Sequence, residues 1–390
     1  MKIIQINTSS VGLNLNEEEN KVNINWGIQV ARELRKKDNN LKIECWFIEK
    51  GYLKEFKKAK EGIKFRIFPT NFSIRHGMEI SLSIINALNK EIINSAKQND
   101  KLIIHLHEYH SWQAYLILDS IKKCKGIKII AQHHGGRSPL ENLKRYKRLI
   151  LFLPLILLMQ LLEKKLFKKI DTFYALSDDE INYLKRITPK SKVKFQTMGI
   201  SEKYYIIQNK KELREKLKLN INKKYILYIG RIKTTKGIKE LLDAMKKIDN
   251  KSIGLLIIGG GADYDKYNKY TKGINLKNVK FLGEIYGDKK LDYLSACDCL
   301  ILPSYTEGAP VVLMEAIAKN LPVIVTDVGG ISKMIANGRE GIIIRPRSSE
   351  EIIKAIENIL KWKDKDIRKH AEKYKWRRII KNTIRDYITE

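Results

Sequence analysis

Two glutamates eight positions apart, Glu307 and Glu315, are the side chains whose type and spacing say most about chemistry in this sequence. Glu307 lies in a loop rich in proline and glycine, and Glu315 lies inside a helical run. The loop follows an apolar strand, so the next helix directs free backbone N–H groups toward a ligand, normally an anion. If all eight residues were helical, the carboxylates would be about 12 Å apart, beyond the roughly 5 to 9.5 Å at which two carboxylates act on one glycosidic carbon. We therefore expect them to hold two different parts of one long, phosphate-bearing ligand.

Two cations follow another strand in the second half of the chain. The strand 225–230 runs into Arg231, and Lys236 directly precedes an amphipathic helix. An arginine binds phosphate oxygens in pairs and a lysine adds a point charge, so together they can neutralise a diphosphate leaving group without a metal. Most lysines in so basic a chain are solvated surface charges, but a position between strand and helix distinguishes these two.

Five of the seven histidines lie between His105 and His134. The spacing of His105, His107 and His110 resembles the zinc motif of metallo-β-lactamase-like hydrolases, although the aspartate that follows in those enzymes is missing. Alternatively, both histidine segments end parallel strands, so that His107 or His110, and His133 or His134, face a cleft as hydrogen-bonding or acid–base groups. A third interpretation is that most of them are satisfied core or surface histidines.

A window of about fourteen apolar residues, 149–162, lies between lysine clusters. It is too short to span a bilayer. With these cationic flanks, the segment 144–169 can lie at an anionic membrane surface, where each basic residue contributes on the order of 1 kcal/mol. It can equally form a buried helix of the first domain, and the sequence leaves both interpretations open.

The overall composition bounds the class of protein. A length of 390 residues suits two domains better than one. The 75 Lys and Arg residues against 44 Asp and Glu give a net charge of +31, which is typical of proteins that bind nucleic acid, anionic lipid or a phosphorylated substrate. No nucleic-acid reader motif is recognisable, so that class stays an alternative. Four cysteines without a disulfide or zinc pattern, and a start that turns polar by Asn7, favour a reducing, cytoplasmic location.

Two series of short apolar runs, typical of buried parallel strands, alternate with helical patterns. The first series comprises 2–6, 43–48, 102–106 and 127–131, and the second comprises 225–230, 255–258, 279–282, 299–302, 322–325 and 341–344. We therefore expect an α/β protein with two doubly wound sheets and a hinge region in the lysine-rich stretch 201–224. Ligands of such folds bind beyond the carboxyl ends of the strands, which predicts a site in the cleft between the domains.

Taken together, these residues resemble the retaining, GT-B-fold glycosyltransferases of family 4, also called glycosyl transferases group 1. The segment GRIKTTKG matches the family pattern G-R-x4-K-G, EGAPVVLME matches E-x7-E, and the similarity is strong over residues 225–345. The resemblance implies two Rossmann-like domains that face each other across a cleft. It also implies a retaining, metal-independent transfer of a sugar from a nucleotide diphosphate sugar to an acceptor hydroxyl, in surface-glycan or lipid-linked saccharide biosynthesis. No cofactor and no nucleic acid is expected, and the expected acceptor is a saccharide or a lipid-linked saccharide. The enzyme is expected in the cytoplasm, with peripheral binding to the cytoplasmic face of the membrane as a second option.

The resemblance gives each motif residue a role. Arg231 and Lys236 bind the donor diphosphate, Glu307 contacts the transferred sugar, and Glu315 contacts the nucleotide ribose. Other expected donor-binding residues are Gly283, Glu284 and Ile285 near the base, and Gly308, Ala309, Pro310 and Val311 along sugar and phosphate. Retention in this family needs no protein nucleophile, so Glu307 is expected to orient the sugar.

The first half departs more often from the family pattern. The segment QHHGG fits the family's strand-end histidine, and His134, favoured over His133, joins the two cations and Glu307 as an expected catalytic group. Gly12, His107 and His133 are the expected acceptor-side residues. The expected domains are 1–203 on the acceptor side, 204–372 for the nucleotide sugar, and a C-terminal helix, 373–390, that returns to the first domain.

Overall fold

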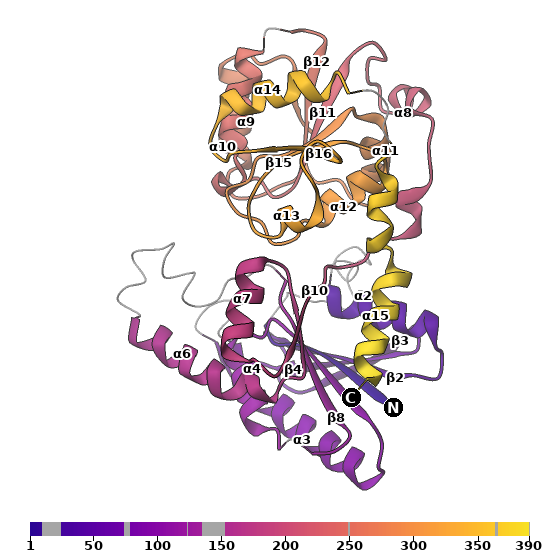
Figure 1. Cartoon of the computed structure of the whole chain (residues 1–390), viewed down its shortest axis with the longest axis vertical. Helices are drawn as coiled ribbons and strands as arrows, with labels where there is room; N and C mark the ends of the chain where they lie inside the picture. The colour runs from indigo at the N-terminus through magenta and orange to yellow at the C-terminus, as the bar shows by residue number, and fades with distance from the viewer. Residues whose placement is uncertain are drawn as a thin grey trace. The chain divides into compact units, whose positions relative to one another are not determined.

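The computed structural model describes residues 1–9, 25–73, 79–122, 124–134, 153–248, 250–362 and 366–389. The chain forms two compact units (Figure 1). The first consists of Met1–Thr197 together with Ile379–Glu390, and the second of Met198–Arg378. From the sequence, the first division is expected after residue 203 and the return to the first unit at residue 373.

The first unit is built on an eight-stranded sheet with the strand order β10-β9-β8-β7-β1-β2-β4-β3. All neighbours are parallel except β3, which pairs antiparallel with β4. The strands are β1 (Lys2–Asn7), β2 (Lys42–Glu49), β3 (Phe56–Lys60), β4 (Ile63–Pro69), β7 (Leu102–His107), β8 (Ile127–Gln132), β9 (Thr172–Ala175) and β10 (Lys192–Phe195). A separate two-stranded ribbon contains β5 (Phe72–Ser73) and β6 (Glu79–Ile80). All four predicted strands of this unit are confirmed.

Helices cover this sheet, and polar side chains mark where several of them begin. They are α2 (Trp26–Lys37), α3 (Leu82–Lys97), α4 (Trp112–Ser120), α6 (Leu153–Leu166) and α7 (Asp178–Ile187), with a short 3₁₀ turn η2 (Phe167–Lys169). The side chains of Asn25, Ser111 and Ser177 each accept a hydrogen bond from a backbone N–H in the first turn of α2, α4 and α7. These caps satisfy N–H groups that have no partner inside the helix, and each stabilises its helix by about 1 kcal/mol.

Helix α6 contains most of the apolar window, and its two faces differ in burial. Met159 and Leu162 pack against the core of the first unit. On the other face, Leu157, Leu158 and Leu161 are 48%, 47% and 67% exposed. No helix within the described ranges is long and apolar enough to cross a membrane. Residues 149–152 of the predicted window lie outside the described residues.

The second unit is a six-stranded parallel sheet with the order β13-β12-β11-β14-β15-β16. Its strands are β11 (Lys224–Ile229), β12 (Ile253–Ile258), β13 (Val279–Phe281), β14 (Cys299–Leu302), β15 (Val323–Thr326) and β16 (Gly341–Ile344). Its helices are α8 (Lys210–Lys216), α9 (Ile238–Lys247), α10 (Tyr264–Gly273), α11 (Gly287–Ala296), α12 (Val311–Ala318), α13 (Ile331–Met334) and α14 (Ser349–Ile359), with the 3₁₀ turns η3 (Glu202–Tyr205), η4 (Thr234–Lys236) and η5 (Arg368–Tyr374). All six predicted strands are present. The strand order reverses between β11 and β14, and in such sheets ligands bind beyond the carboxyl ends of the strands at this switch point.

The last helix, α15 (Trp376–Ile388), belongs to both units. Its first residues lie with the second unit, where the Trp376 ring packs so closely on Gly199 that a Cβ atom at residue 199 would come within 2.4 Å of it. From Ile379 onward the helix belongs to the first unit, and Ile380 and Tyr387 are buried there. The chain thus closes the first unit with its own C-terminal segment.

Candidate functional site

The loop after β11 presents both predicted cations at the carboxyl end of the second sheet. Arg231 is exposed, and its backbone carbonyl accepts a hydrogen bond of 3.0 Å from the Tyr228 hydroxyl. Lys236 ends the turn η4, and Gly237 follows with a φ of 67°. A Cβ atom at residue 237 would lie 2.0 Å from the Pro303 carbonyl oxygen, so only glycine fits between the two loops. This close approach brings the loop after β11 against the loop after β14.

The two predicted motifs meet in an ion pair. The Lys236 ammonium lies 2.6 Å from Glu307 Oε1, and the side chains are only 16% and 11% exposed. The same ammonium lies 3.4 Å from the Thr306 carbonyl oxygen, and Ser304 Oγ donates to Glu307 Oε1 at 2.7 Å. Glu307 is therefore held by two donors on its Oε1 atom, and its orientation is set before any ligand binds.

Another glycine fixes the backbone around Glu307. Gly329 has a φ of 65°, and a Cβ atom there would lie 1.9 Å from the Glu307 carbonyl oxygen. The next N–H, of Gly330, donates to the Gly308 carbonyl at 2.8 Å. The Thr326 hydroxyl at the end of β15 donates to the Ser304 carbonyl at 2.5 Å. The loop that contains Glu307 thus rests on the loop after β15.

Helix α12 begins directly after this loop. Gly308, Ala309 and Pro310 lead into it, and Val311 is its first residue. Pro310 caps the helix without a side-chain hydrogen bond, and it has no N–H of its own to offer a ligand. The helix N-terminus nevertheless places the positive end of the α12 dipole beside the ion pair.

Glu315 lies further along α12 and is 5% exposed. Its two carboxylate oxygens accept hydrogen bonds of 2.8 and 2.7 Å from Lys290 of α11. The Lys290 ammonium also lies 5.6 Å from the centre of the Tyr204 ring. Burial and the Glu315 carboxylate together raise the pKa of the Tyr204 hydroxyl well above its ordinary value. The sequence motif predicts Glu315 but neither of these two partners, which come from distant segments without a recognisable spacing.

The loops after β12 and β13 complete this edge of the sheet. The Gly259 N–H donates to the Gly283 carbonyl at 2.8 Å, and a Cβ atom at residue 259 would lie 1.9 Å from the Gly230 carbonyl oxygen. A Cβ atom at Gly260 would lie 2.7 Å from Glu284 Oε1. Glu284 itself is exposed, and Ile285 beside it is half-buried. All predicted donor-side residues therefore lie on loops at the carboxyl ends of the second sheet or on α12, which begins there.

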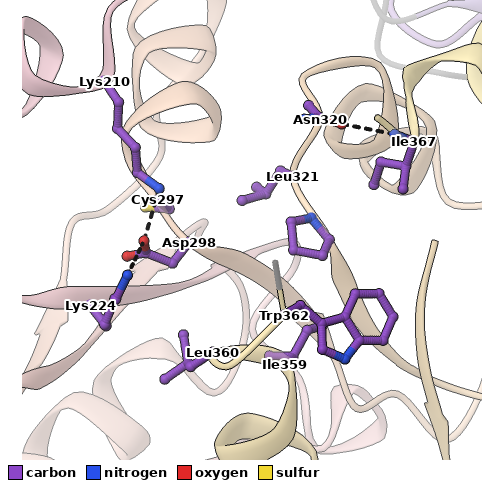
Figure 2. Close-up of a pocket in the computed structure, with 11 residues that line it drawn as sticks. Lys210, Lys224, Cys297, Asp298, Asn320, Leu321, Ile359, Leu360, Trp362 and Ile367 are labelled. Atoms are coloured by element: carbon purple, nitrogen blue, oxygen red, sulfur yellow. Dashed lines mark hydrogen bonds and ion pairs between the residues drawn. The ribbon is translucent and has the colours of Figure 1, made fainter. Parts of the chain in front are cut away.

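A cavity of about 170 Å³ lies at the opposite edge of the same sheet, where β11, β14 and β15 begin (Figure 2). Trp362, Leu360 and other apolar side chains line one part of it, and Asp298 lies in another. The Asp298 carboxylate accepts from Lys210 at 2.8 Å and from the Tyr225 N–H at 2.7 Å. The Tyr225 contact joins the start of β14 to β11, and the Lys210 contact joins it to α8, so Asp298 already has partners within the second unit.

The first unit contains the predicted histidines, and their rings have different partners. His105 Nδ1 lies 2.8 Å from the Tyr387 hydroxyl, and His110 Nδ1 lies 2.6 Å from Glu163. His107 lies with one nitrogen 2.8 Å from Gln5 and the other 2.8 Å from His134.

Within the described ranges no three His, Cys, Asp or Glu side chains are arranged to hold one metal ion. The metal cluster of the hydrolase alternative, formed by His105, His107 and His110, is therefore wrong, because each ring turns to its own hydrogen-bond partner.

Glu163 of α6 explains why the His110 ring does not point toward His105 and His107. Its carboxylate is fully buried and accepts from His110, from the Tyr115 hydroxyl at 2.6 Å and from the Tyr183 hydroxyl. Burial alone would raise the pKa of this carboxyl, but His110 and the two hydroxyls lower it below its ordinary value. This buried network ties α6 to α4 and α7, and sequence spacing alone gives no sign of it.

His133 and His134 differ sharply in their surroundings. His133 is buried, and its Nε2 lies 2.9 Å from the Glu108 carboxylate. Burial would lower its pKa, but Glu108 raises it to about 9. Burial lowers the pKa of His134 to about 4, and its Nδ1 has no hydrogen-bond partner in the described part of the chain. His134 therefore offers a neutral ring with one uncommitted nitrogen, whereas His133 is a buried cation. Gly12, the remaining acceptor-side residue, lies outside the described residues.

Residues 209–377 match the family model described as glycosyl transferases group 1. Over 216 residues the chain is 32% identical to an uncharacterised glycosyltransferase of Methanocaldococcus jannaschii, and this match covers 51% of this chain and 55% of that protein. It is 34% identical over 149 residues to the putative teichuronic acid biosynthesis glycosyltransferase TuaC of Bacillus subtilis, covering 38% and 36% of the two chains. It is 28% identical over 206 residues to the N,N'-diacetylbacillosaminyl-diphospho-undecaprenol alpha-1,3-N-acetylgalactosaminyltransferase of Campylobacter jejuni, covering 51% and 54%. The chain spans about half the length, or less, of these curated relatives.

Solved structures resemble the whole chain. A sucrose-phosphate synthase of Thermosynechococcus elongatus matches with a TM-score of 0.71 and 18% identity, covering 99% of this chain and 98% of the other. The Anabaena protein HepE in complex with UDP matches with a TM-score of 0.68 and 16% identity, covering 99% of each chain. At these identities the likeness concerns the fold, and it confirms the predicted GT-B fold with its two Rossmann-like units.

Proposed function

Since residues 209–377 form a domain of the glycosyl transferases group 1 family, we propose that this protein transfers a sugar from a nucleotide diphosphate sugar to an acceptor hydroxyl. The observation that carries the proposal is the ion pair of Lys236 with Glu307. It combines the two family motifs at the carboxyl ends of β11 and β14, where a doubly wound sheet binds its ligand.

The charges at this edge suit a diphosphate. Arg231 and Lys236 supply two cations, and the N-terminus of α12 adds the positive end of a helix dipole. In our proposal these groups stabilise the negative charge of the departing diphosphate, so the reaction needs no metal ion. Gly308, Ala309 and Val311 line the phosphate and sugar with backbone groups.

Glu307 is proposed to orient the transferred sugar. One carboxylate oxygen is held by Lys236 and by Ser304, which leaves the other oxygen to accept from a sugar hydroxyl. Glu315 is proposed to bind the ribose, and Lys290 would then hold that carboxylate in place. We propose retention of the anomeric configuration without a covalent enzyme intermediate, with His134 as a further group that accepts from a substrate hydroxyl.

A panel of nucleotide diphosphate sugars tests the proposal by thermal shift. At least one donor is expected to raise the melting temperature of the wild type, and the same donor is expected to have little effect on Arg231→Ala. A donor found in this way can then be used to measure transfer with and without a chelator and to determine the anomeric configuration of the product by NMR. If no nucleotide stabilises the wild type, the proposed function fails.

We further propose that the acceptor is lipid-linked and that the enzyme works at the cytoplasmic face of a membrane. The Campylobacter jejuni relative is named for a diphospho-undecaprenol substrate. On α6, the exposed Leu157, Leu158 and Leu161 continue along the helix into the exposed Lys164 and Lys165. A stripe that is apolar and then cationic suits an anionic membrane surface.

Vesicle sedimentation tests this membrane face. Binding to vesicles that contain anionic lipid is expected to fall at least about fivefold in the double variant Leu157→Asp, Leu161→Asp. The control is Leu82→Asp, Ile93→Asp on α3, where two apolar side chains are exposed to 55% and 53% without being part of this stripe. Equal vesicle binding by the wild type and the α6 variant would refute the membrane face without affecting the proposed transfer reaction.

A further inference from the structure

A chain of buried hydrogen bonds connects the C-terminal helix to the strand-end histidine of the first unit. The Gln5 side-chain amide donates through Nε2 to the Tyr387 hydroxyl at 3.1 Å, and its Oε1 lies 2.8 Å from His107 Nε2. His107 Nδ1 lies 2.8 Å from His134 Nε2. Gln5, His107 and Tyr387 are fully buried. This series of hydrogen bonds ends at His134 Nδ1, which is buried and has no hydrogen-bond partner among the described residues.

The side-chain amide of Gln5 determines which atom donates in each of these hydrogen bonds. A side-chain amide oxygen only accepts, so the hydrogen in the bond between Gln5 and His107 lies on His107 Nε2. A neutral imidazole has one N–H, so His107 Nδ1 has a lone pair and accepts from His134 Nε2. His134 Nδ1 is then left with the lone pair of a neutral ring. One amide thus determines the hydrogen positions on two successive histidines.

Both rings are neutral at ordinary pH, as this assignment requires. Burial and the neighbouring His105 and His134 hold the pKa of His107 well below its ordinary value. Burial lowers the pKa of His134 to about 4 despite the opposing effect of Glu108. Both rings therefore stay uncharged over the physiological range, and each can change only in which of its two nitrogens has the hydrogen.

The surroundings keep the rings in place. A Cβ atom at Gly27 would lie 3.1 Å from His107 Nε2, so α2 packs directly against that ring. The Trp26 ring lies 4.3 Å from the His134 ring, measured between centres. The Tyr387 hydroxyl is also 2.8 Å from His105 Nδ1, which fixes the hydroxyl toward which the Gln5 amide points. Gln5 and His107 are fully buried, so neither the amide nor the His107 ring can turn without displacing packed neighbours.

We propose that Gln5, His107 and Tyr387 are positioning residues that hold His134 in the tautomer with hydrogen on Nε2, so that its Nδ1 accepts a hydrogen bond from a substrate hydroxyl. The inference rests on the proposed function, because the hydrogen-bond donor for the Nδ1 lone pair is a hydroxyl of the transferase substrate. It assigns to residues at both ends of the chain a role that no motif marks. These three residues act through the tautomer of His134 and do not themselves contact the substrate.

The tautomer is directly measurable by ¹⁵N NMR on the full chain with labelled histidine. Long-range proton–nitrogen spectra distinguish a protonated ring nitrogen from one with a lone pair, and a His134→Gln variant assigns the signals. In the wild type, His134 is expected to have its hydrogen on Nε2. In Gln5→Leu and in Tyr387→Phe, the His134 Nδ1 signal is expected to move toward the average of both tautomers. The control Tyr174→Phe also removes a buried hydroxyl that bonds to α15, through Asp386, and is expected to leave the signal unchanged.

The kinetic consequence is separate from the spectroscopic one. If the two tautomers become equally populated, the competent fraction halves and kcat falls about twofold, while KM for the donor changes little. Tyr387→Phe keeps the test open if Gln5→Leu does not fold. Hydrogen on Nδ1 of wild-type His134, or an unchanged signal in the variants, would overturn the inference. A protein with the expected tautomer but no response to any nucleotide sugar would instead overturn the proposed function.

Discussion

Loss of the Lys236 charge gives the sharpest prediction for the proposed donor site. An ammonium has three N–H donors, and in the described structure Glu307 at 2.6 Å and the Thr306 carbonyl at 3.4 Å receive two of them. A third remains for a phosphate oxygen, so a bound diphosphate can add to the ion pair without breaking it. A hydrogen bond to a charged group contributes about 1.5 to 3 kcal/mol, which corresponds to a loss of about ten- to a hundredfold in affinity when the charge is removed. We expect Lys236→Met to weaken diphosphate binding by this factor.

Isothermal titration with nucleoside diphosphates measures the effect directly. The matched control is Lys239→Met in the first turn of α9, where the ammonium is 63% exposed and pairs with Asp243 at 2.6 Å. Both variants lose one positive charge from the same helix region, but only Lys236 lies in the proposed site. We expect the Lys239 variant to bind within about twofold of the wild type, because exposed charges contribute little. Equal affinities of the two variants would refute the diphosphate site.

The partner of the ion pair gives the opposite sign for the same measurement. Glu307→Gln removes a negative charge next to the proposed diphosphate, so binding of the nucleoside diphosphate alone is expected to become tighter, by about threefold to tenfold. Transfer of the sugar is expected to fall by about a hundredfold, because the carboxylate that orients the sugar is lost. Weaker diphosphate binding by this variant would refute the expected repulsion and would mean that Glu307 acts mainly by positioning Lys236.

Two further predictions concern stability. Gly329→Ala is expected to destabilise the second unit by at least about 3 kcal/mol, because backbone strain and a clash with the Glu307 carbonyl add. The control Gly287→Ala, at a φ of 61° with no atom within 4 Å, is expected to cost only about 1 kcal/mol. Urea unfolding measures both losses, and equal losses would contradict the clash. The contact between Glu108 and His133 is expected to contribute about 2 kcal/mol, fully present between pH 4.5 and 6.5. It is lost as pH rises toward the His133 pKa of about 9, and as pH falls toward the Glu108 pKa of about 2. The difference in melting temperature between the wild type and His133→Gln should follow this profile, and a difference that is constant with pH would refute it.

The predicted strands of both sheets were recognisable because they are mostly buried and read as continuous apolar runs. Strands β9 and β10 of the first sheet were not predicted, since each has only four residues and β10 alternates lysines with apolar residues. The edge hairpin of β3 and β4 was not predicted. Strand β3 has the sequence FKKAK and is largely exposed, so it has no apolar run, and its pairing is fixed by a turn in which Glu61 and Gly62 both have positive φ. A turn of this kind matches the twist of a hairpin, but a single Glu-Gly pair is too common in sequences to predict one.

The donor-side loops came together as expected, because residues that directly follow parallel strands meet at one edge of a sheet. Their partners were not predictable. Lys290 reaches Glu315 from another helix, and Tyr387 reaches Gln5 from the far end of the chain. Such contacts depend on how helices pack on the sheets, which no spacing within a motif encodes. The alternative zinc arrangement is wrong for the same reason: the buried Glu163, from a segment far along the chain, binds His110 instead.

The ion pair between Lys236 and Glu307 also joins two motifs that lie 71 positions apart, and this makes their contributions inseparable. With both side chains mostly buried, removing one leaves the other charge partly desolvated and unpaired, which costs more than the pair itself contributes. The double variant Lys236→Met, Glu307→Gln should therefore be less destabilised than the sum of the single variants, by a coupling energy of about 1 to 2 kcal/mol in urea unfolding. Strictly additive losses would mean that the two side chains do not pair in solution. The proposed site would then be assembled only when a donor binds.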